Sequence, residues 1–210
     1  MDHIDDKDHR HEASLETTLD FLNTAELDGS GEPLEHLATL ADATAWLVEH
    51  DLLYPEEARP LGRLSAARQG HLLEHVRTAR AAVREVVESL VAVRPAAAPA
   101  VATVNELLGA RTVVAFVIAD GVLAARNRHV GDALEDALAR LVDPLVDSVV
   151  AGDTGRLRIC ADDGCRWVFE DTSRTGRRRW CSMASCGNRA KAARHRARQR
   201  GTLPPVSDGP

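Results

Sequence analysis

The feature that most constrains the fold of this chain is its set of cysteines, because all of them lie in one short stretch. The chain has four cysteines, which form two C-x4-C pairs separated by fifteen residues: Cys160 with Cys165, and Cys181 with Cys186. Four intervening residues allow a turn that directs both sulfurs of a pair to one point, and residues 162–164 favour such a turn. Two such turns brought together form the tetrahedral site of structural zinc. We therefore predict one structural Zn²⁺ ion with these four cysteines as its ligands.

Three other interpretations of the cysteines are weaker. The N-terminus lacks the apolar core of a signal peptide, which indicates a reducing cytoplasmic setting and disfavours disulfides. Unrelated buried thiols would be scattered along the chain, whereas the rest of this sequence contains none. A catalytic metal is disfavoured because four thiolates leave no open coordination position for a substrate or a water.

Charge is divided unevenly along the chain, although the formal net charge is only −6 at pH 7. From Arg156 to Arg200, thirteen Arg or Lys residues stand against four Asp or Glu residues, so this stretch carries +9 and the remainder −15. Such asymmetry indicates a basic module attached to an acidic body, and basic modules commonly bind nucleic acid. No apolar run approaches the roughly 20 residues of a membrane span, so no membrane partner is expected.

Residues 14–152 are predicted to form a mostly helical body with a β-hairpin. Helices are expected over 34–53, over 65–93, in a short segment that ends at Leu108, and over 131–150. The clearest of them, 65–93, has an apolar stripe at steps of four and three residues: Leu72, Val76, Ala79, Val83, Val86 and Leu90. The segment TVVAFVIADGVLAAR predicts the hairpin, with a tight turn at Asp120-Gly121.

The remaining segments give weaker signals. Residues 14–26 show no clear period and could begin with a strand or a helix. Pro144 is expected to kink or divide the helix over 131–150. The tails, residues 1–13 and 201–210, are expected to be disordered, with the first of them acidic and rich in histidine.

The stretch 156–200 resembles the CGNR zinc finger, which is named after the tetrapeptide that stands here at residues 186–189. The resemblance is carried by the four cysteines, by DTSR at 171–174, by RRWCSM at 178–183 and by CGNR itself. The preceding body resembles the ABATE domain, whose opening signature corresponds to LDFLNT at 19–24. Proteins with this pairing are regarded as stress-linked transcription regulators, so the resemblance implies an α+β body, a zinc module and a regulatory role.

The sequence behind the last cysteine predicts a basic helix. AKAARHRARQR contains strong helix formers and no breaker before Gly201, and Asn188 could cap its start. Because charge surrounds most of this helix, it needs outside partners for stability, and DNA phosphates are suitable. We predict that a nucleic-acid surface is formed by Arg177, Arg178, Arg179, Arg189, Lys191, Arg194, Arg196 and Arg198.

Several functional alternatives remain at this point. The same surface could bind RNA or a ribosome, or it could be a solvated face or dock on an acidic protein surface. A nuclease is disfavoured because His195 is the only histidine after Cys160 and carboxylates there are few, so no enzymatic activity is expected. Trp167 and Trp180 could stack on bases, although a packing role is favoured. The body could sense a small-molecule effector or form homo-oligomers; Asp20, Asn23 and Thr24 could line a pocket, but turn and capping roles are favoured.

Overall fold

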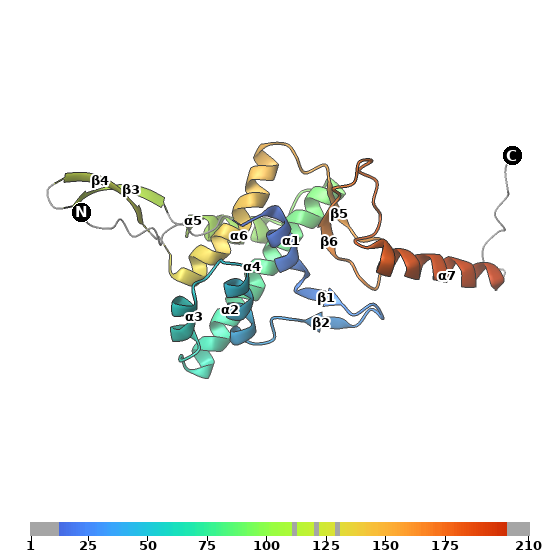
Figure 1. Ribbon diagram of the computed structural model, residues 1–210, viewed down its shortest axis with the longest axis horizontal. Helices are drawn as coiled ribbons and strands as arrows, with labels where there is room; N and C mark the ends of the chain where they lie inside the picture. The colour runs from blue at the N-terminus through green and yellow to red at the C-terminus, as the bar shows by residue number, and fades with distance from the viewer. Residues whose placement is uncertain (1–12, 111–112, 120–121, 129–130, 201–210) are drawn as a thin grey trace. The chain divides into compact units, whose positions relative to one another are not determined.

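The computed structural model describes residues 13–110, 113–119, 122–128 and 131–200 (Figure 1). Contacts divide the chain into two compact units. Among the described residues, the helical unit comprises those up to Ala25 together with Glu35–Gly155, and the cysteine unit comprises Glu26–Leu34 together with those from Arg156 onward. The predicted α+β class is confirmed, because helices dominate and short two-stranded sheets accompany them.

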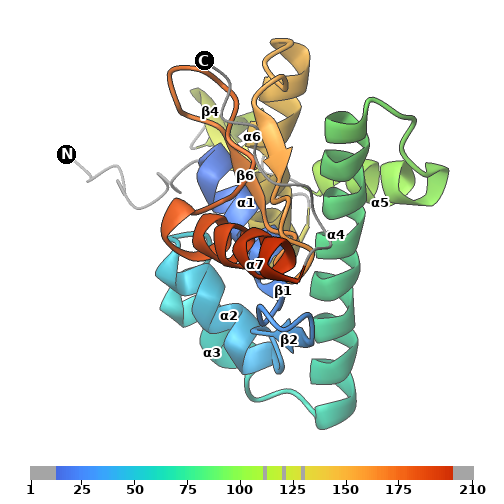
Figure 2. The same ribbon diagram turned by 90° about the vertical axis from the view of Figure 1, so that its right-hand side faces the viewer.

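The helical unit is built around one long helix. Its elements in chain order are α1 (Leu15–Asn23), α2 (Leu40–Glu49), α3 (Pro55–Leu61), α4 (Ala66–Ala92), α5 (Ala98–Gly109), the strands β3 (Val113–Ala119) and β4 (Val122–Arg128), and α6 (Ala133–Val150). Helix α4 contacts α1, α2, α5 and α6, while α3 packs against α2 (Figure 1 and Figure 2). None of the described helices combines the length and the apolar character that a membrane crossing requires.

The core of the helical unit follows the apolar stripe of α4. Leu72, Val76, Ala79 and Val83 are buried as the stripe predicts. Val86 and Leu90 are only half-buried, while the adjacent Val87 is fully buried. The inward face of α4 therefore shifts by one residue near its end. Alternating steps of three and four residues average 3.5 per turn, so over several turns such a stripe drifts around a helix that has 3.6 residues per turn.

A buried polar cluster joins Arg80 of α4 to Thr24 and Glu35. Arg80 of α4 is only 6% exposed, and its Nη1 donates hydrogen bonds to Thr24 Oγ1 and Glu35 Oε1, each at 2.8 Å. Its Nη2 donates to the second oxygen of Glu35. Burial by itself would raise the pKa of Glu35, but the bonds from Arg80 and from the Leu37 amide outweigh it and lower that pKa. The pair therefore stays ionised and ties both ends of the 25–34 segment to α4.

The helix predicted over 34–53 needs correction at both ends. The helix expected over 34–53 is shorter, since β2 (Pro33–Glu35) precedes it and a capping box between Thr39 and Asp42 starts α2 at Leu40. At its other end α2 stops at Glu49, and Pro55 begins a separate helix, α3, because proline suits the first helical turn, where the amide hydrogen has no partner.

The other predicted elements are found with modest changes. The ambiguous segment at 14–26 contains a helix, α1, and the start of β1 (Ala25–Leu27). Strands β3 and β4 pair antiparallel as predicted, and the turn expected at Asp120-Gly121 lies outside the described residues. Helix α6 continues through Pro144 without division. Residues 1–12 and 201–210 also lie outside the described residues, so the predicted disorder of the tails is not tested.

The cysteine unit contains little regular structure. Its elements are β5 (Leu157–Ile159), β6 (Val168–Glu170), a single π-helical turn, η2 (Met183–Gly187), and α7 (Asn188–Gln199), together with most of β1 and β2. Strands β5 and β6 pair antiparallel, with Ile159 opposite Val168. The predicted ranges, 14–152 and 156–200, placed residues 26–34 in the helical body, whereas contacts group Glu26–Leu34 with the cysteine unit.

Candidate metal centre

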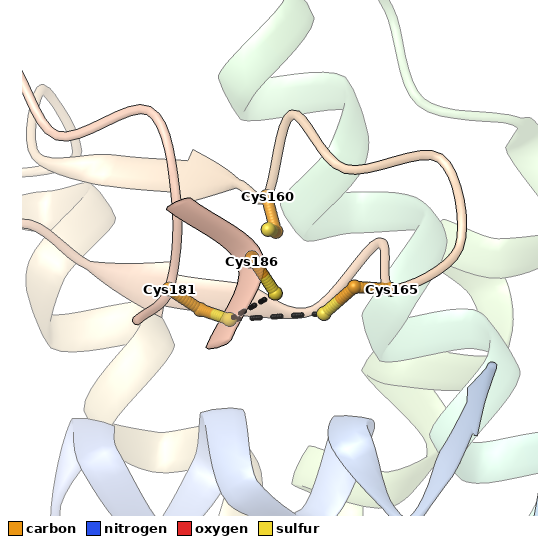
Figure 3. A group of neighbouring side chains, drawn as sticks. All are labelled: Cys160, Cys165, Cys181 and Cys186. Atoms are coloured by element: carbon orange, nitrogen blue, oxygen red, sulfur yellow. Dashed lines mark hydrogen bonds between the residues drawn. The ribbon is translucent and has the colours of Figure 1, made fainter. Parts of the chain in front are cut away.

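The four cysteines lie at the ends of short structural elements that bring their sulfurs together. Cys160 follows β5 directly, and Cys165 lies at the end of a turn in which Asp162 Oδ1 accepts a hydrogen bond from the Gly164 amide at 3.1 Å. Cys181 precedes η2, and Cys186 lies inside it. Figure 3 shows the four side chains pointing toward a common centre.

The sulfur geometry fits one zinc ion. The Sγ atom of Cys181 lies 3.7 Å from that of Cys165 and 3.6 Å from that of Cys186, and all four sulfurs lie within 4.8 Å of one another. A tetrahedral zinc with bonds of about 2.3 Å would place its sulfur ligands about 3.8 Å apart. No disulfide joins the cysteines. The cluster can therefore hold one zinc ion, and four thiolates leave no open position for catalysis.

The protonation of the thiols depends on their burial and on the backbone around them. Burial raises the pKa of Cys165 to about 12 and also raises the pKa of Cys181. Burial acts in the same direction on Cys160, but hydrogen bonds with the backbone of Cys181 and Asp162 outweigh it and lower the pKa of that thiol. Without a metal the four sulfurs cannot all be thiolates near neutral pH, so a bound cation is what makes the cluster fully ionised.

Aromatic side chains pack against the cysteine cluster. Trp167, Phe169 and Trp180 are partly buried against Cys160, Cys165 and Cys186. This packing supports the favoured structural role of the two tryptophans. A module with so few apolar groups gains much of its folding free energy from the metal, on the order of 10 kcal/mol in small zinc modules.

The segment Glu26–Leu34 completes the cysteine unit from a distant part of the chain. The Gly29 amide donates to the Gly164 carbonyl at 2.9 Å, and the Trp167 indole Nε1 donates to the Glu26 carboxylate. A Cβ on Gly164 would lie 2.8 Å from the Gly29 carbonyl oxygen, so only glycine permits this approach. The Asp28 carboxylate shapes the loop by accepting from the Ser30 amide at 2.8 Å.

Each residue of the CGNR tetrapeptide has a contact inside the unit. Cys186 is one of the four clustered sulfurs. Gly187 has ordinary helical dihedrals, and a Cβ there would lie 2.7 Å from Sδ of the flexible Met183 side chain. Asn188 was predicted to cap α7, but it is already helical, and its Nδ2 instead donates to the Ala184 carbonyl at 3.0 Å.

Arg189 points back toward the cysteine cluster. Its Nε donates to Asp162 Oδ2 at 2.8 Å, and its Nη2 lies 3.1 Å from Cys186 Sγ in hydrogen-bond geometry. Burial alone would raise the pKa of Asp162, but the bond from Arg189 and that from the Gly164 amide lower it, so the carboxylate is ionised. Arg189 thus joins the first cysteine turn to the second.

The DTSR motif organises the loop between β6 and the second cysteine pair. Asp171 is fully buried and accepts from the Ser173 amide at 3.0 Å and from the Arg178 amide at 2.7 Å. The Arg178 guanidinium lies 4.9 Å from the Phe169 ring centroid and donates to the Cys181 carbonyl. Arg178, like Arg189, therefore has internal partners, which periodicity and charge counting did not reveal.

The remaining predicted nucleic-acid residues lie on the surface. Arg179 is exposed with its guanidinium 5.2 Å from the Trp180 ring centroid. The others are exposed and form no ion pair with the part of the chain that the structure describes: Arg177, Lys191, Arg194, Arg196 and Arg198. No residue of α7 is buried, and Lys191, Arg194, Arg196 and Arg198 are all exposed.

The candidate pocket residues of LDFLNT have structural contacts. Thr24 Oγ1 donates to the Phe21 carbonyl at 2.6 Å and accepts from Arg80, while Asn23 is buried. Asp20 is exposed. The contacts of Thr24 support the turn and capping role that was favoured over a ligand pocket.

Comparison with protein families agrees with the resemblance noted in the sequence. A family model described as "CGNR zinc finger" matches residues 156–199. A second model, ABATE, described as "Putative stress-induced transcription regulator", matches residues 15–153. No curated protein matches the chain significantly.

Proposed function

The chain belongs to the ABATE family, described as "Putative stress-induced transcription regulator", and carries a CGNR zinc finger behind it; on that premise we propose that it binds duplex DNA through α7 and the neighbouring residues 177–179. In this proposal the zinc ion is structural and the helical unit senses a signal or dimerises. Neither family description names an enzyme.

The observation that carries the proposal is the uncompensated charge of α7. Lys191, Arg194 and Arg198 follow one another at spacings of three and four residues, which places them in one row on the helix surface. Like charges at this spacing repel and destabilise a helix. A partner with regularly spaced negative charge would remove that repulsion, and DNA carries one phosphate per about 1.7 Å of its axis.

The dimensions of α7 suit a DNA groove. Its twelve residues span about 18 Å at 1.5 Å per residue. The major groove of B-DNA is about 12 Å wide and admits an α-helix with side chains. Because η2 and the last zinc ligand directly precede α7, metal binding would hold the first turn of the helix in place, so that fewer degrees of freedom are lost on binding.

The test measures binding of zinc-loaded protein to a labelled mixed-sequence duplex by fluorescence anisotropy at several salt concentrations. We expect log K to fall linearly with log salt, by about 0.9 per phosphate neutralised. Replacing Arg194 and Arg198 together with alanine should weaken binding and reduce the slope by roughly two. Arg68→Ala is the matched control, since Arg68 is exposed on α4 and far from α7 in sequence.

The outcomes separate the candidates. Equal binding by the parent and the double variant, with zinc content intact, would overturn the assignment of α7. Tighter binding to single-stranded or structured RNA than to the duplex at the same salt would assign the surface to RNA instead.

A further inference from the structure

Arg189 is the one cation of α7 with an ion-pair partner in the described part of the cysteine unit. It lies in the first turn of the helix, three residues after Cys186, with its guanidinium turned back toward the cluster. The Arg189 side chain is itself 45% exposed, and the remaining cationic side chains of this helix are exposed without an ion-pair partner among the described residues. This difference in direction separates Arg189 from the surface that we propose for DNA.

We infer that Arg189 is a positioning residue of the metal centre rather than a DNA-contacting residue. Three groups surround its guanidinium. Asp162 belongs to the turn between Cys160 and Cys165 and accepts from Nε at 2.8 Å, and Cys186 Sγ lies 3.1 Å from Nη2. The third group is Gly29 of the distant β1–β2 loop, which leaves room for the guanidinium because it has no side chain; a Cβ there would lie 3.1 Å from Nη1.

The chemistry of this arrangement favours metal retention. Zinc with four thiolates carries a net charge of −2, and a donor N–H directed at one sulfur stabilises that charge. The planar fork of arginine lets one side chain reach a carboxylate and a sulfur at once, which a lysine ammonium does not reproduce. Because Asp162 and Cys186 lie in different cysteine pairs, Arg189 holds the two halves of the ligand set at a fixed separation.

Outer groups of this kind affect metal affinity. Removing hydrogen-bonding partners of ligands typically weakens metal binding by 10- to 100-fold. We therefore expect Arg189→Gln to raise the zinc dissociation constant of the full-length protein by that factor in competition with a chromophoric chelator. Arg189→Lys should retain only part of the affinity, since an ammonium lacks the planar fork that directs N–H groups on separate nitrogens at the two partners.

A matched variant separates the metal role from loss of charge. Arg196→Ala removes one positive charge from the same helix at an exposed position without a partner in the described residues. We expect its zinc affinity to stay within about twofold of the parent. With Co²⁺ in place of zinc, the thiolate-to-metal charge-transfer band should shift in Arg189→Gln and stay unchanged in Arg196→Ala, because only the first variant removes a hydrogen bond to sulfur.

A second variant guards against a mere folding defect. Asp162→Asn keeps the size of the side chain but removes the charge that holds Arg189, so it should weaken zinc binding in the same direction. Its effect should not add fully to that of Arg189→Gln, since both changes break the same contact between Arg189 and Asp162.

The inference stands apart from the proposed DNA function. At saturating zinc, Arg189→Gln should lose no more duplex affinity than Arg196→Ala. Parent-like zinc affinity together with an unshifted cobalt spectrum in Arg189→Gln would overturn it. A much larger loss of DNA binding in Arg189→Gln than in Arg196→Ala, with zinc fully bound, would also overturn it and would return Arg189 to the DNA surface.

Discussion

The indole nitrogen of Trp167 donates a hydrogen bond to the carboxylate of Glu26, which lies 141 residues earlier in the chain. The contact joins a strand that follows α1 to the loop that carries Cys165. Together with the bond between Gly29 and Gly164, it makes the first β-ribbon of the chain a structural part of the metal module.

Chelation of the metal should therefore loosen two segments that are far apart in sequence. We expect hydrogen exchange of the amides in 26–34 to accelerate together with that in 156–186 when a chelator removes zinc, because Gly29 bonds to the turn between two ligands. The amides of α4 serve as an internal reference and should keep their protection. Unchanged exchange at Gly29 after complete zinc removal would show that the ribbon is held independently of the metal.

Substitution of Gly164 should destabilise the cysteine unit without touching a ligand. In Gly164→Ala the new methyl group would lie 2.8 Å from the Gly29 carbonyl oxygen, and backbone must move to relieve the overlap. We expect a loss of about 1–3 kcal/mol in the unfolding free energy of this unit, measured by denaturant titration of zinc-loaded protein.

The matched control for this substitution is Gly155→Ala. A Cβ at Gly155 meets no atom within 4 Å, so this variant should unfold like the parent. Equal stability of Gly164→Ala and Gly155→Ala would mean that the approach of the two loops contributes nothing.

Zinc affinity should fall as the pH is lowered. The pKa of Cys165 is raised to about 12 and that of Cys181 is raised as well, both mainly by burial, so zinc must displace a proton from each to bind two thiolates near neutral pH. Each displaced proton makes binding about tenfold weaker per pH unit of acidification, which gives about 100-fold per unit for two. Chelator competition between about pH 6 and about pH 8 measures this slope, and a flat profile would contradict it.

Removal of Arg80 should destabilise the helical unit. In Arg80→Ala the buried guanidinium is lost, and Thr24 and Glu35 lose a shared partner. We expect the unfolding free energy to fall by about 2–3 kcal/mol, with a smaller loss in Arg80→Lys because the charge remains but the fork does not. Arg68→Ala, at an exposed position of the same helix, should have little effect.

The ion pair between Arg80 and Glu35 also predicts how acid affects the stability of the helical unit. The pKa of Glu35 in the folded protein is below its ordinary value of 4.5. Its contribution to stability is therefore complete above about pH 4.5 and is lost as the pH falls through the lowered pKa. Denaturant midpoints of the parent should decline more steeply below about pH 4.5 than those of Arg80→Ala, in which Glu35 has lost this stabilising partner. Parallel declines would show that other carboxylates dominate.

Local patterns in the sequence were sufficient for several elements of this protein. The spacing of Cys160, Cys165, Cys181 and Cys186 predicted one cluster, because a short turn limits where the two sulfurs of a pair can point. The stripe through Leu72, Val76 and Ala79 predicted α4, since helical periodicity depends only on residues a turn apart. Both signals are short-range, and tertiary contacts did not override them.

Only the tertiary structure decided which arginines bond within the protein and which segments belong to the cysteine unit. Arg189 and Arg194 stand five residues apart in the same basic helix and are both exposed, yet the first bonds to Asp162 and Cys186 while the second has no ion-pair partner among the described residues. Their charges are equal in sequence; what differs is the direction of each side chain relative to the preceding cysteine turn. Likewise, the sequence around Glu26 gives no sign that this residue accepts a hydrogen bond from Trp167. Periodicity and composition report which residues share a face of one element, whereas contacts across 141 residues exist only once the chain has folded.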